Sequence, residues 1–451
     1  MKRPLLHLLL LLVTNSIFAI SMQEAEQRAL ESSPAIRLGN LQSEQNDAQY
    51  AQALLSWFPE ITFGSMAAIL QKSQKISHLQ KQKHLFSNQF TLTQPIFSSD
   101  LLGNLKLSRL IKEGGAVGKE MAISDTLYAV RTQYILYGMK NQELALEHVK
   151  LAFLQQVYQD ETIRLKTGRS TQLQVAKAKA AISYEISKQM DAQKESTEAR
   201  HELALLLHLP PQEEAGLKVD HFPSIADYPL LKEKQRLLQN YLMKNTLNET
   251  PPKLSLFNEE EINNLLAKAR ANRPELKKTR LYVQAADAKK SQSHTQYLPE
   301  VSAFVDYGYY QPVNGQFFRQ RNDWAGGVQL SWSLFDSLKR EMKSKETVAF
   351  RKAALIAYEF ENDKLEITIR HDTSEIEEAL FLYQNSQENL YLAQQTLEEA
   401  EVQFGAGSLS ELQLQDAKKF LSESEFGQTQ ALSSLLQKYY QLQHDIGVDL
   451  N

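Results

Sequence analysis

The chain repeats one pattern of residues twice, with a period of about 240 positions. Each half contains a Pro-Glu pair, at Pro59-Glu60 and at Pro299-Glu300. Two segments of alternating character follow in each half and end at a phenylalanine, Phe97 or Phe335. A long proline-free stretch comes next in both halves, and a glycine-containing tip interrupts it. This duplication predicts two copies of a strand hairpin, each followed by a long helical hairpin.

The repeat also predicts how the chain is divided. We expect a signal peptide at 1–21, a first repeat at 22–209, a connecting segment at 210–272 and a second repeat at 273–451. The strand hairpins are expected at about 60–96 and 300–335, and the tips of the helical hairpins at about 166–172 and 405–411.

The N-terminus has the features of a secretory signal. Lys2 and Arg3 form a basic start, an apolar run covers 5–13, and cleavage could follow Ala19 or Ser21. The run is too short to cross a bilayer as a helix. An uncleaved N-terminal anchor is the alternative. Either way, the sequence predicts that the protein leaves the cytoplasm.

Composition excludes several kinds of chemistry. The chain has no cysteine, which excludes disulfides, thiol catalysis, cysteine-bound metals and lipid attachment at a cysteine. The net charge of −4 becomes −6 when Lys2 and Arg3 leave with the signal. A mildly acidic chain gives no support to nucleic-acid binding, so no nucleic-acid partner is expected.

The proline-free stretches have the periodicity of long supercoiling helices. Apolar residues recur every seven positions in the second half, and positions 239 residues earlier are apolar as well. The second-half series is Ile369, Ile376, Tyr383, Leu390, Leu397 and Phe404, and the first-half series is Val130, Tyr137, Leu144, Leu151, Tyr158 and Leu165. A seven-residue repeat indicates helices that wind around partners. Gly114, Gly115 and Gly118 predict a kink or break in the first long helix.

The segments before these helices have strand periodicity. Apart from Gly326, the even positions of 324–334 are apolar, and the length of this segment suits a tilted strand crossing a bilayer. Trp57, Tyr297, Trp324 and Trp332 lie in or beside the strands, as expected for aromatic residues at a membrane interface. The alternative is a soluble hairpin with one wet face. Four membrane strands cannot close by themselves, so several chains would have to share one barrel.

Taken in order, these residues make the chain similar to the TolC-like outer-membrane efflux proteins over nearly its whole mature length. The matching features are Ser33-Pro34 and Arg273-Pro274, the two Pro-Glu pairs, the two phenylalanines, and the tips, where Leu173 and Ala178 follow Gly168 and Leu412 and Ala417 follow Gly407. Each motif is short, and their doubled order at one spacing carries the resemblance.

The resemblance implies an α+β membrane protein that is a homotrimer. Four strands from each chain would close a twelve-stranded β-barrel in outer-membrane lipid of a Gram-negative-type envelope. Long α-helices would continue it as a coiled-coil tunnel through the periplasm. The implied function is a passive exit duct for efflux or type I secretion that docks on a periplasmic adaptor and an inner-membrane pump.

The resemblance also implies roles for individual residues. The adaptor-docking tips would be Thr167, Gly168, Arg169, Ala406, Gly407 and Ser408. The pore constriction would involve Asp416, Gln413 and Gln174. Phe404 and Leu409 stand where some members hold the gate shut with a tyrosine and an arginine, so closure here would depend on packing.

Two other classes of function remain as alternatives. No metalloprotease, nucleophile-elbow, phosphate-loop or dinucleotide motif is present, and the ten histidines are scattered, so we expect no enzyme, no cofactor and no metal site. A secreted or periplasmic coiled-coil structural or adhesion protein would account for the signal and the heptads. It would not predict the aromatic strands.

Overall fold

The computed structural model describes residues 18–69, 84–244, 255–312 and 321–448. These residues form two compact units. One unit contains residues up to 38 together with 120–274 and 363–451, and the other contains 39–119 and 275–362. Most of the expected signal peptide, residues 1–17, lies outside the described part of the chain.

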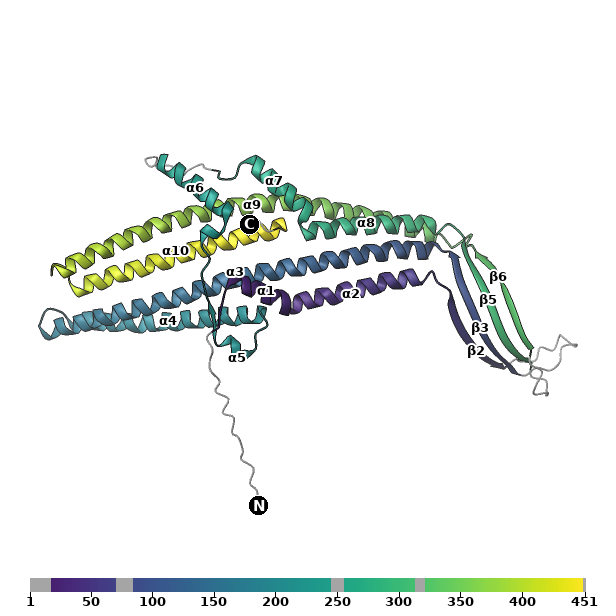
Figure 1. Ribbon diagram of the computed structural model, residues 1–451, viewed down its shortest axis with the longest axis horizontal. Coiled ribbons are helices and arrows are strands. Elements are labelled where there is room, and N and C mark those ends of the chain that lie inside the picture. Colours follow the sequence, from purple (N-terminus) through teal and green to yellow (C-terminus); the bar gives the residue numbers. More distant parts are fainter. Residues whose placement is uncertain (1–17, 70–83, 245–254, 313–320, 449–451) are drawn as a thin grey trace, which may run out of the picture. The chain divides into compact units, whose positions relative to one another are not determined.

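The unit of 39–119 and 275–362 contains the strands. Its sheet has the order β2-β3-β5-β6, and every neighbouring pair is antiparallel (Figure 1). The strands are β2 (Glu60–Ile69), β3 (His84–Phe97), β5 (Glu300–Pro312) and β6 (Arg321–Ser331). The pairing of β3 with β5 joins the two halves of the sequence into one sheet.

The last strand lies earlier in the sequence than its alternation suggests. β6 ends at Ser331, so Trp332 and Leu334 lie beyond it. The Trp332 indole nitrogen donates to the backbone oxygen of Tyr297 at 3.1 Å. Ser337 and Leu338 then take positive φ angles of 60° and 65° as the chain turns toward the next helix. Alternating polarity continues past the last ladder pair because it records side-chain environment and not hydrogen bonding.

Long helices flank the sheet segments in the sequence. They are α2 (Pro34–Leu55), α3 (Ser99–Lys166), α8 (Pro274–Thr295) and α9 (Lys339–Gly405). The expected break in the first long helix is wrong, because α3 continues without interruption through Gly114, Gly115 and Gly118. A Cβ atom added at Gly115 would lie 2.5 Å from the Asn46 side chain of α2. One at Gly103 would lie 2.2 Å from Gln292 of α8. Two of the glycines in α3 therefore allow neighbouring helices to approach closely.

The other unit has a core built around the N-terminal segment. β1 (Phe18–Ile20) pairs in parallel with β4 (Leu217–Val219). Ile20 is buried in a cluster with residues of α3 and of α4 (Gln172–Leu206). The Tyr134 hydroxyl donates to the Ile20 backbone oxygen at 3.0 Å. Cleavage after Ser21 would remove Ile20 and the helix cap at Ser21, whereas cleavage after Ala19 would keep both.

The connecting segment begins with α5 (Pro211–Glu214), which lies against α4, and with β4. Its later elements are η1 (Ile225–Asp227), α6 (Pro229–Lys244) and α7 (Glu259–Asn272), and this later part packs on the second helical hairpin, which is completed by α10 (Glu411–Ile446). Glu377 of α9 accepts hydrogen bonds from the backbone nitrogens of Leu256 and Phe257 at 2.6 and 2.9 Å. The Tyr228 and Tyr440 hydroxyls lie 2.5 Å apart. These bonds attach the segment to α9 and α10.

The two halves start their helices in the same way. α1 (Met22–Ser32) and α7 both begin with a capping box, formed by Ser21 with Glu24 and by Asn258 with Glu261. One residue separates the end of each of these helices from a proline, and that proline is the first residue of the next helix, α2 or α8. Proline is favoured at that first helical position because its missing N–H has no partner in a helix anyway.

Burial along the heptad seam decreases toward the tips. Ile369, Ile376 and Tyr383 are buried, whereas Leu397 is half-buried and Phe404 is 40% exposed. The second hairpin therefore does not cover its own seam along the whole length. Among the described residues, no helix has both the length and the apolar character needed to span a membrane.

Candidate functional site: helical tips and a one-sided sheet

The two helical hairpins turn through the same backbone motif. Gly168 and Gly407 have φ angles of 72° and 73°, in the left-handed region that favours glycine. The Arg169 nitrogen donates to the Arg164 oxygen at 2.8 Å, and the Ser408 nitrogen donates to the Gln403 oxygen at 3.0 Å. These six-to-one bonds define a Schellman motif at the end of α3 and of α9. The predicted tip residues therefore occupy equivalent turns.

Equivalent caps start the returning helices. The Gln174 nitrogen donates to Thr171 Oγ1 at 3.3 Å, and the Gln413 nitrogen donates to Ser410 Oγ at 3.3 Å. The Gln413 side chain also closes a capping box, because its Oε1 accepts from the Ser410 nitrogen at 3.0 Å. The structure thus gives Gln413 a local role at the helix start.

Asp416 is the one acidic residue among the three predicted constriction residues, and it lies near the tip of the second hairpin. The Asp416 side chain is 65% exposed, and its Oδ1 lies 3.6 Å from the Lys419 ammonium. Lys419 also lies over the Phe153 ring, 4.9 Å from the ring centre. Gln174 is exposed on the first hairpin. A pore-lining role for these side chains stays a prediction.

A small apolar cluster stabilises the second tip. Ala400, Leu414 and Ala417 are buried together, and Leu409 packs against them. Leu409 therefore provides apolar packing at a position where some TolC-like proteins have a polar residue that holds the gate shut. Phe404 remains partly exposed beside the turn.

The sheet has one apolar and one polar face. Its register forms an aromatic row across all four strands, Phe63, Phe90, Tyr307 and Trp324. The next row on the same face is Ile61, Leu92, Val305 and Gly326. On the opposite face the Thr91 hydroxyl donates to the Asp306 carboxylate at 2.7 Å. Strands of a membrane β-barrel have this pattern, with an apolar face toward lipid and a polar face toward a water-filled interior.

The predicted interface aromatics differ in their surroundings. Trp324 lies within β6 and is 77% exposed, while Trp332 and Tyr297 are joined by the indole hydrogen bond. The Arg340 guanidinium lies 4.9 Å from the Tyr297 ring centre. Trp57 precedes β2, and its backbone oxygen accepts from the Gln94 side chain at 2.7 Å. Three of the four therefore lie at the junction of helix and strand, while Trp324 lies in the aromatic row.

The first hairpin contains a carboxyl pair that the sequence analysis does not predict. Glu185 of α4 is only 8% exposed, and burial and the neighbouring Glu147 of α3 raise the pKa of Glu185 to about 7. The pKa of Glu147 is lowered, because hydrogen bonds from Glu185 and Lys150 outweigh the effect of burial. The equivalent positions in the second hairpin are Ser386 and Ser424. Helix periodicity places both glutamates, but only the packing shows that they meet.

Buried charges also meet where α9 approaches the end of α10. Burial and the adjacent Asp445 raise the pKa of Asp372 to about 8. A hydrogen bond with Asp445 raises the pKa of His444 to about 8, with a further contribution from Asp125. The Arg273 guanidinium lies 2.9 Å from Asp445. Asp372 lies 73 positions before Asp445, and Arg273 is more distant still, so no local motif could have predicted that these groups meet.

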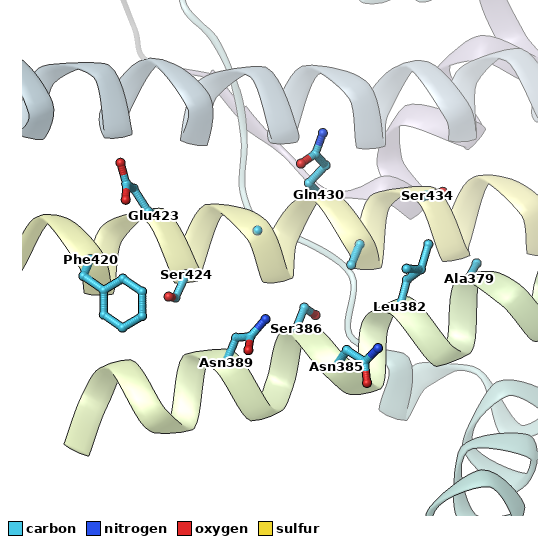
Figure 2. A pocket seen from close by; sticks show the side chains of 12 residues that line it. Ala379, Leu382, Asn385, Ser386, Asn389, Phe420, Glu423, Ser424, Gln430 and Ser434 are labelled. Atoms are coloured by element: carbon cyan, nitrogen blue, oxygen red, sulfur yellow. The ribbon is translucent and has the colours of Figure 1, made fainter. Parts of the chain in front are cut away.

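A groove of about 730 Å³ lies between α9 and α10 (Figure 2). Small and amide side chains dominate its lining, including Ala379, Ser386, Asn389 and Ser424. Phe420 and Leu382 add apolar surface. Because small residues at a helical seam allow close approach, this groove is suited to receive another helix.

Comparison with known proteins identifies the fold and gives a family match for the second half of the chain. The profile of the family described as outer membrane efflux protein matches residues 265–448. The structure is similar to VceC, an outer membrane protein of Vibrio cholerae, with a TM-score of 0.72 and 14% identity over 95% of this chain and 97% of that one. The second half of the chain therefore resembles the outer membrane efflux protein family, in agreement with the resemblance seen in the sequence.

Two further channels have the same fold. The Campylobacter jejuni CmeC outer membrane channel has a TM-score of 0.72 at 12% identity, over 94% of this chain and 85% of that one. The open state of the Neisseria gonorrhoeae MtrE outer membrane channel has a TM-score of 0.70 at 15% identity, over 95% and 89%. No curated protein sequence matches the chain.

The comparisons support several of the sequence predictions. The α+β fold of a TolC-like channel is confirmed, and the family matched by residues 265–448 is one of efflux channels and not of enzymes. The matched family and the similar structures are outer-membrane proteins, in agreement with the predicted location in the outer membrane. The family match also agrees with the predicted function as an outer-membrane efflux duct.

Proposed function

We propose that three copies of this protein close one twelve-stranded barrel and form a shared exit duct. The observation that carries this proposal is the open four-stranded sheet with an apolar face. Its edge strands, β2 and β6, have unpaired backbone groups on their outer sides. Lipid does not tolerate such edges, because no water is available to satisfy them.

The strand directions support closure by identical chains. Each neighbouring pair from β2 to β6 is antiparallel, so the two edge strands run in opposite directions. The β6 edge of one copy can therefore pair antiparallel with the β2 edge of the next. Repetition of this contact gives a closed ring, which is how homo-oligomers with one kind of head-to-tail interface avoid open fibres.

The helices support the same assembly in the periplasm. Their heptad seam is incompletely covered near the tips, and the groove between α9 and α10 is lined by small residues. Hairpins of neighbouring copies would bury these surfaces as a coiled-coil tunnel. The aromatic residues Trp57, Tyr297, Trp324 and Trp332 would lie at the lipid interfaces.

We further propose that the tips dock on a periplasmic adaptor that is bound to an inner-membrane pump. The two tips are equivalent in backbone geometry, and residues 167–169 and 406–408 are exposed. The duct is passive in this scheme, and the pump supplies the energy and selects the cargo. A secreted coiled-coil scaffold accounts less well for the apolar sheet face and for the family match.

Disulfide trapping tests the shared barrel. The chain has no cysteine, so introduced pairs are the only thiols. Thr62→Cys on β2, combined in turn with Ala325→Cys, Gly327→Cys or Gln329→Cys on β6, samples the possible registers between copies. After oxidation of isolated outer membranes, at least one combination should give covalent dimers and trimers on a non-reducing gel.

The matched control places both cysteines inside one sheet. Thr91→Cys with Asp306→Cys joins directly opposed residues of β3 and β5 and should give only monomers. The proposal would be overturned if no edge combination gave a ladder and if the detergent-extracted protein had the mass of a single chain.

A further inference from the structure

One surface of α9 brings together three side chains that can bind a metal ion. They are His371, Asp372 and Glu375, and one ligand atom from each lies within 4.8 Å of the others. His371 Nδ1 lies 3.5 Å from a Glu375 oxygen and 3.9 Å from Asp372 Oδ1. The sequence analysis gives no metal site, because it relies on paired-histidine motifs and misses a histidine with a carboxylate four positions later.

The environment of Asp372 distinguishes this cluster from an ordinary group of acidic residues. Asp372 is 4% exposed, and its Oδ2 has no hydrogen-bond donor among the described residues. An isolated buried carboxylate is unfavourable unless a cation or a proton compensates its charge.

The neighbouring carboxylates already have cationic partners. Lys438 Nζ lies 2.8 Å from Glu375 Oε1, and Arg273 lies 2.9 Å from Asp445. The Lys438 contact uses one Glu375 oxygen and leaves Oε2 facing His371. His371 Nδ1 lies 3.9 Å from Asp372 Oδ1, and the charge of Arg273 also acts on Asp372. Even so, Asp372 Oδ2 accepts no hydrogen bond among the described residues.

We propose that His371, Asp372 and Glu375 bind one divalent transition-metal ion, for which Zn²⁺ is the representative probe. One imidazole nitrogen and two carboxylate oxygens form a ligand set that suits Zn²⁺ and similar ions. In a tetrahedral zinc site with bonds of about 2.0–2.2 Å, neighbouring ligand atoms lie roughly 3.3–3.6 Å apart. The 3.5 Å separation of His371 and Glu375 already matches this spacing, and the 3.9 Å separation of His371 and Asp372 exceeds it by a few tenths of an ångström. Asp372 and Glu375 lie within 4.8 Å of each other, so the Asp372 side chain would have to move toward the ion.

Access and position support the assignment. The His371 side chain is 65% exposed, so an ion can enter from solvent and keep water at its remaining coordination positions. Asp372 lies against Asp445 near the end of α10. A bound cation would reduce repulsion between these two carboxylates and stabilise the packing of α9 against α10. Metal binding in this position is therefore expected to raise the thermal stability of the protein.

The site is a property of the second half of the chain alone. The positions 239 residues earlier are Thr132, Gln133 and Leu136, none of which is a good ligand for this class of metal. The sequence duplication therefore gives no second copy of this site, and the proposal is for one ion per chain at this position.

Zinc titration of the full-length, tag-free protein in detergent tests the proposal. After removal of metals with a chelator, calorimetry with Zn²⁺ should show one saturable site per chain. His371→Ala and Glu375→Gln should each weaken binding at this site by at least about tenfold, because loss of a ligand or its support typically costs 10–100-fold in affinity. Both residues are at least partly exposed, so neither variant is expected to disturb folding.

Matched controls separate this site from adventitious binding. His148→Ala and Glu378→Gln remove an exposed histidine and an exposed glutamate from other positions on α3 and α9 and should leave the affinity unchanged. Zn²⁺ should also raise the melting temperature of the wild-type protein and not that of His371→Ala. Equal zinc affinity in His371→Ala and wild type, or absence of saturable binding in the wild type, would overturn the proposal.

Discussion

At the scale of single residues, the Glu147 and Glu185 pair is the clearest case of packing that changes chemistry. These two carboxyl groups meet between helices, where two negative charges would repel each other. One of the two therefore favours its protonated form. The Ser386 and Ser424 positions of the second hairpin carry no such charge. The two hairpins, although equivalent in backbone, should therefore respond differently to pH.

The pair predicts a specific dependence of stability on pH. The pKa of Glu185 is raised from 4.5 to about 7, so the folded chain binds more protons than the unfolded chain between these values. This contribution to stability is complete below the unfolded pKa and is lost as pH rises through about 7. The lowered pKa of Glu147 acts in the opposite sense and offsets part of the effect.

Glu185→Gln should remove this dependence. Glutamine resembles the protonated acid, so the variant should be more stable than wild type by on the order of 1–3 kcal/mol at about pH 8 and similar to it at about pH 5. Thermal unfolding followed by circular dichroism at both pH values measures the difference. Glu198→Gln, an exposed change on the same helix, serves as the control. A gain in stability of the same size at both pH values would contradict this account.

At the scale of elements, the tip turns depend on backbone conformations that only glycine adopts easily. Gly407 has positive φ, whereas Gly405, two residues earlier, ends α9 with ordinary helical geometry and has open space around its Cα. The two glycines therefore form an internal comparison. One is needed for the turn and the other is not.

Gly407→Ala should loosen the second tip, because a left-handed conformation costs a non-glycine residue about 1–2 kcal/mol. Backbone amides of the turn should exchange with deuterium roughly ten times faster, since about 1.4 kcal/mol corresponds to a factor of ten. Gly405→Ala should leave exchange unchanged or slow it, as alanine favours the helix. If the two variants had equal exchange rates, the Schellman turn would not be what orders the tip.

The elements differ in how well the sequence predicts them. The heptads, prolines and tip glycines predict both long hairpins, because these signals are local and repeated. The uninterrupted α3 was not predicted, since Gly115 is explained by contact with Asn46, which is 69 positions away. The contacts of Glu185, Asp372 and His371 were also missed, because they depend on which helix faces pack together or on rotamers that periodicity does not specify.

At the scale of the whole molecule, oligomerisation is indicated by surfaces and backbone groups that have no partner within one chain. Two sheet edges, an apolar sheet face and incompletely covered heptads are each unfavourable in a single chain. A shared barrel and tunnel satisfies all three at once. The same assembly would place three copies of each tip around one axis, so a single carboxylate per chain becomes a ring of three.

Asp416 is the residue through which this arrangement would affect transport. A ring of three carboxylates at the narrow end of a duct should attract cations, although Lys419 at 3.6 Å screens each carboxylate in part. Asp416→Ala should therefore reduce the cation preference of the channel, measured as a shift of the reversal potential toward zero under a salt gradient in planar bilayers. Glu398→Gln removes an exposed acidic residue elsewhere on α9 and should leave the reversal potential unchanged. Unaltered selectivity in Asp416→Ala, with a wild-type number of open channels, would show that Asp416 lies outside the conducting path.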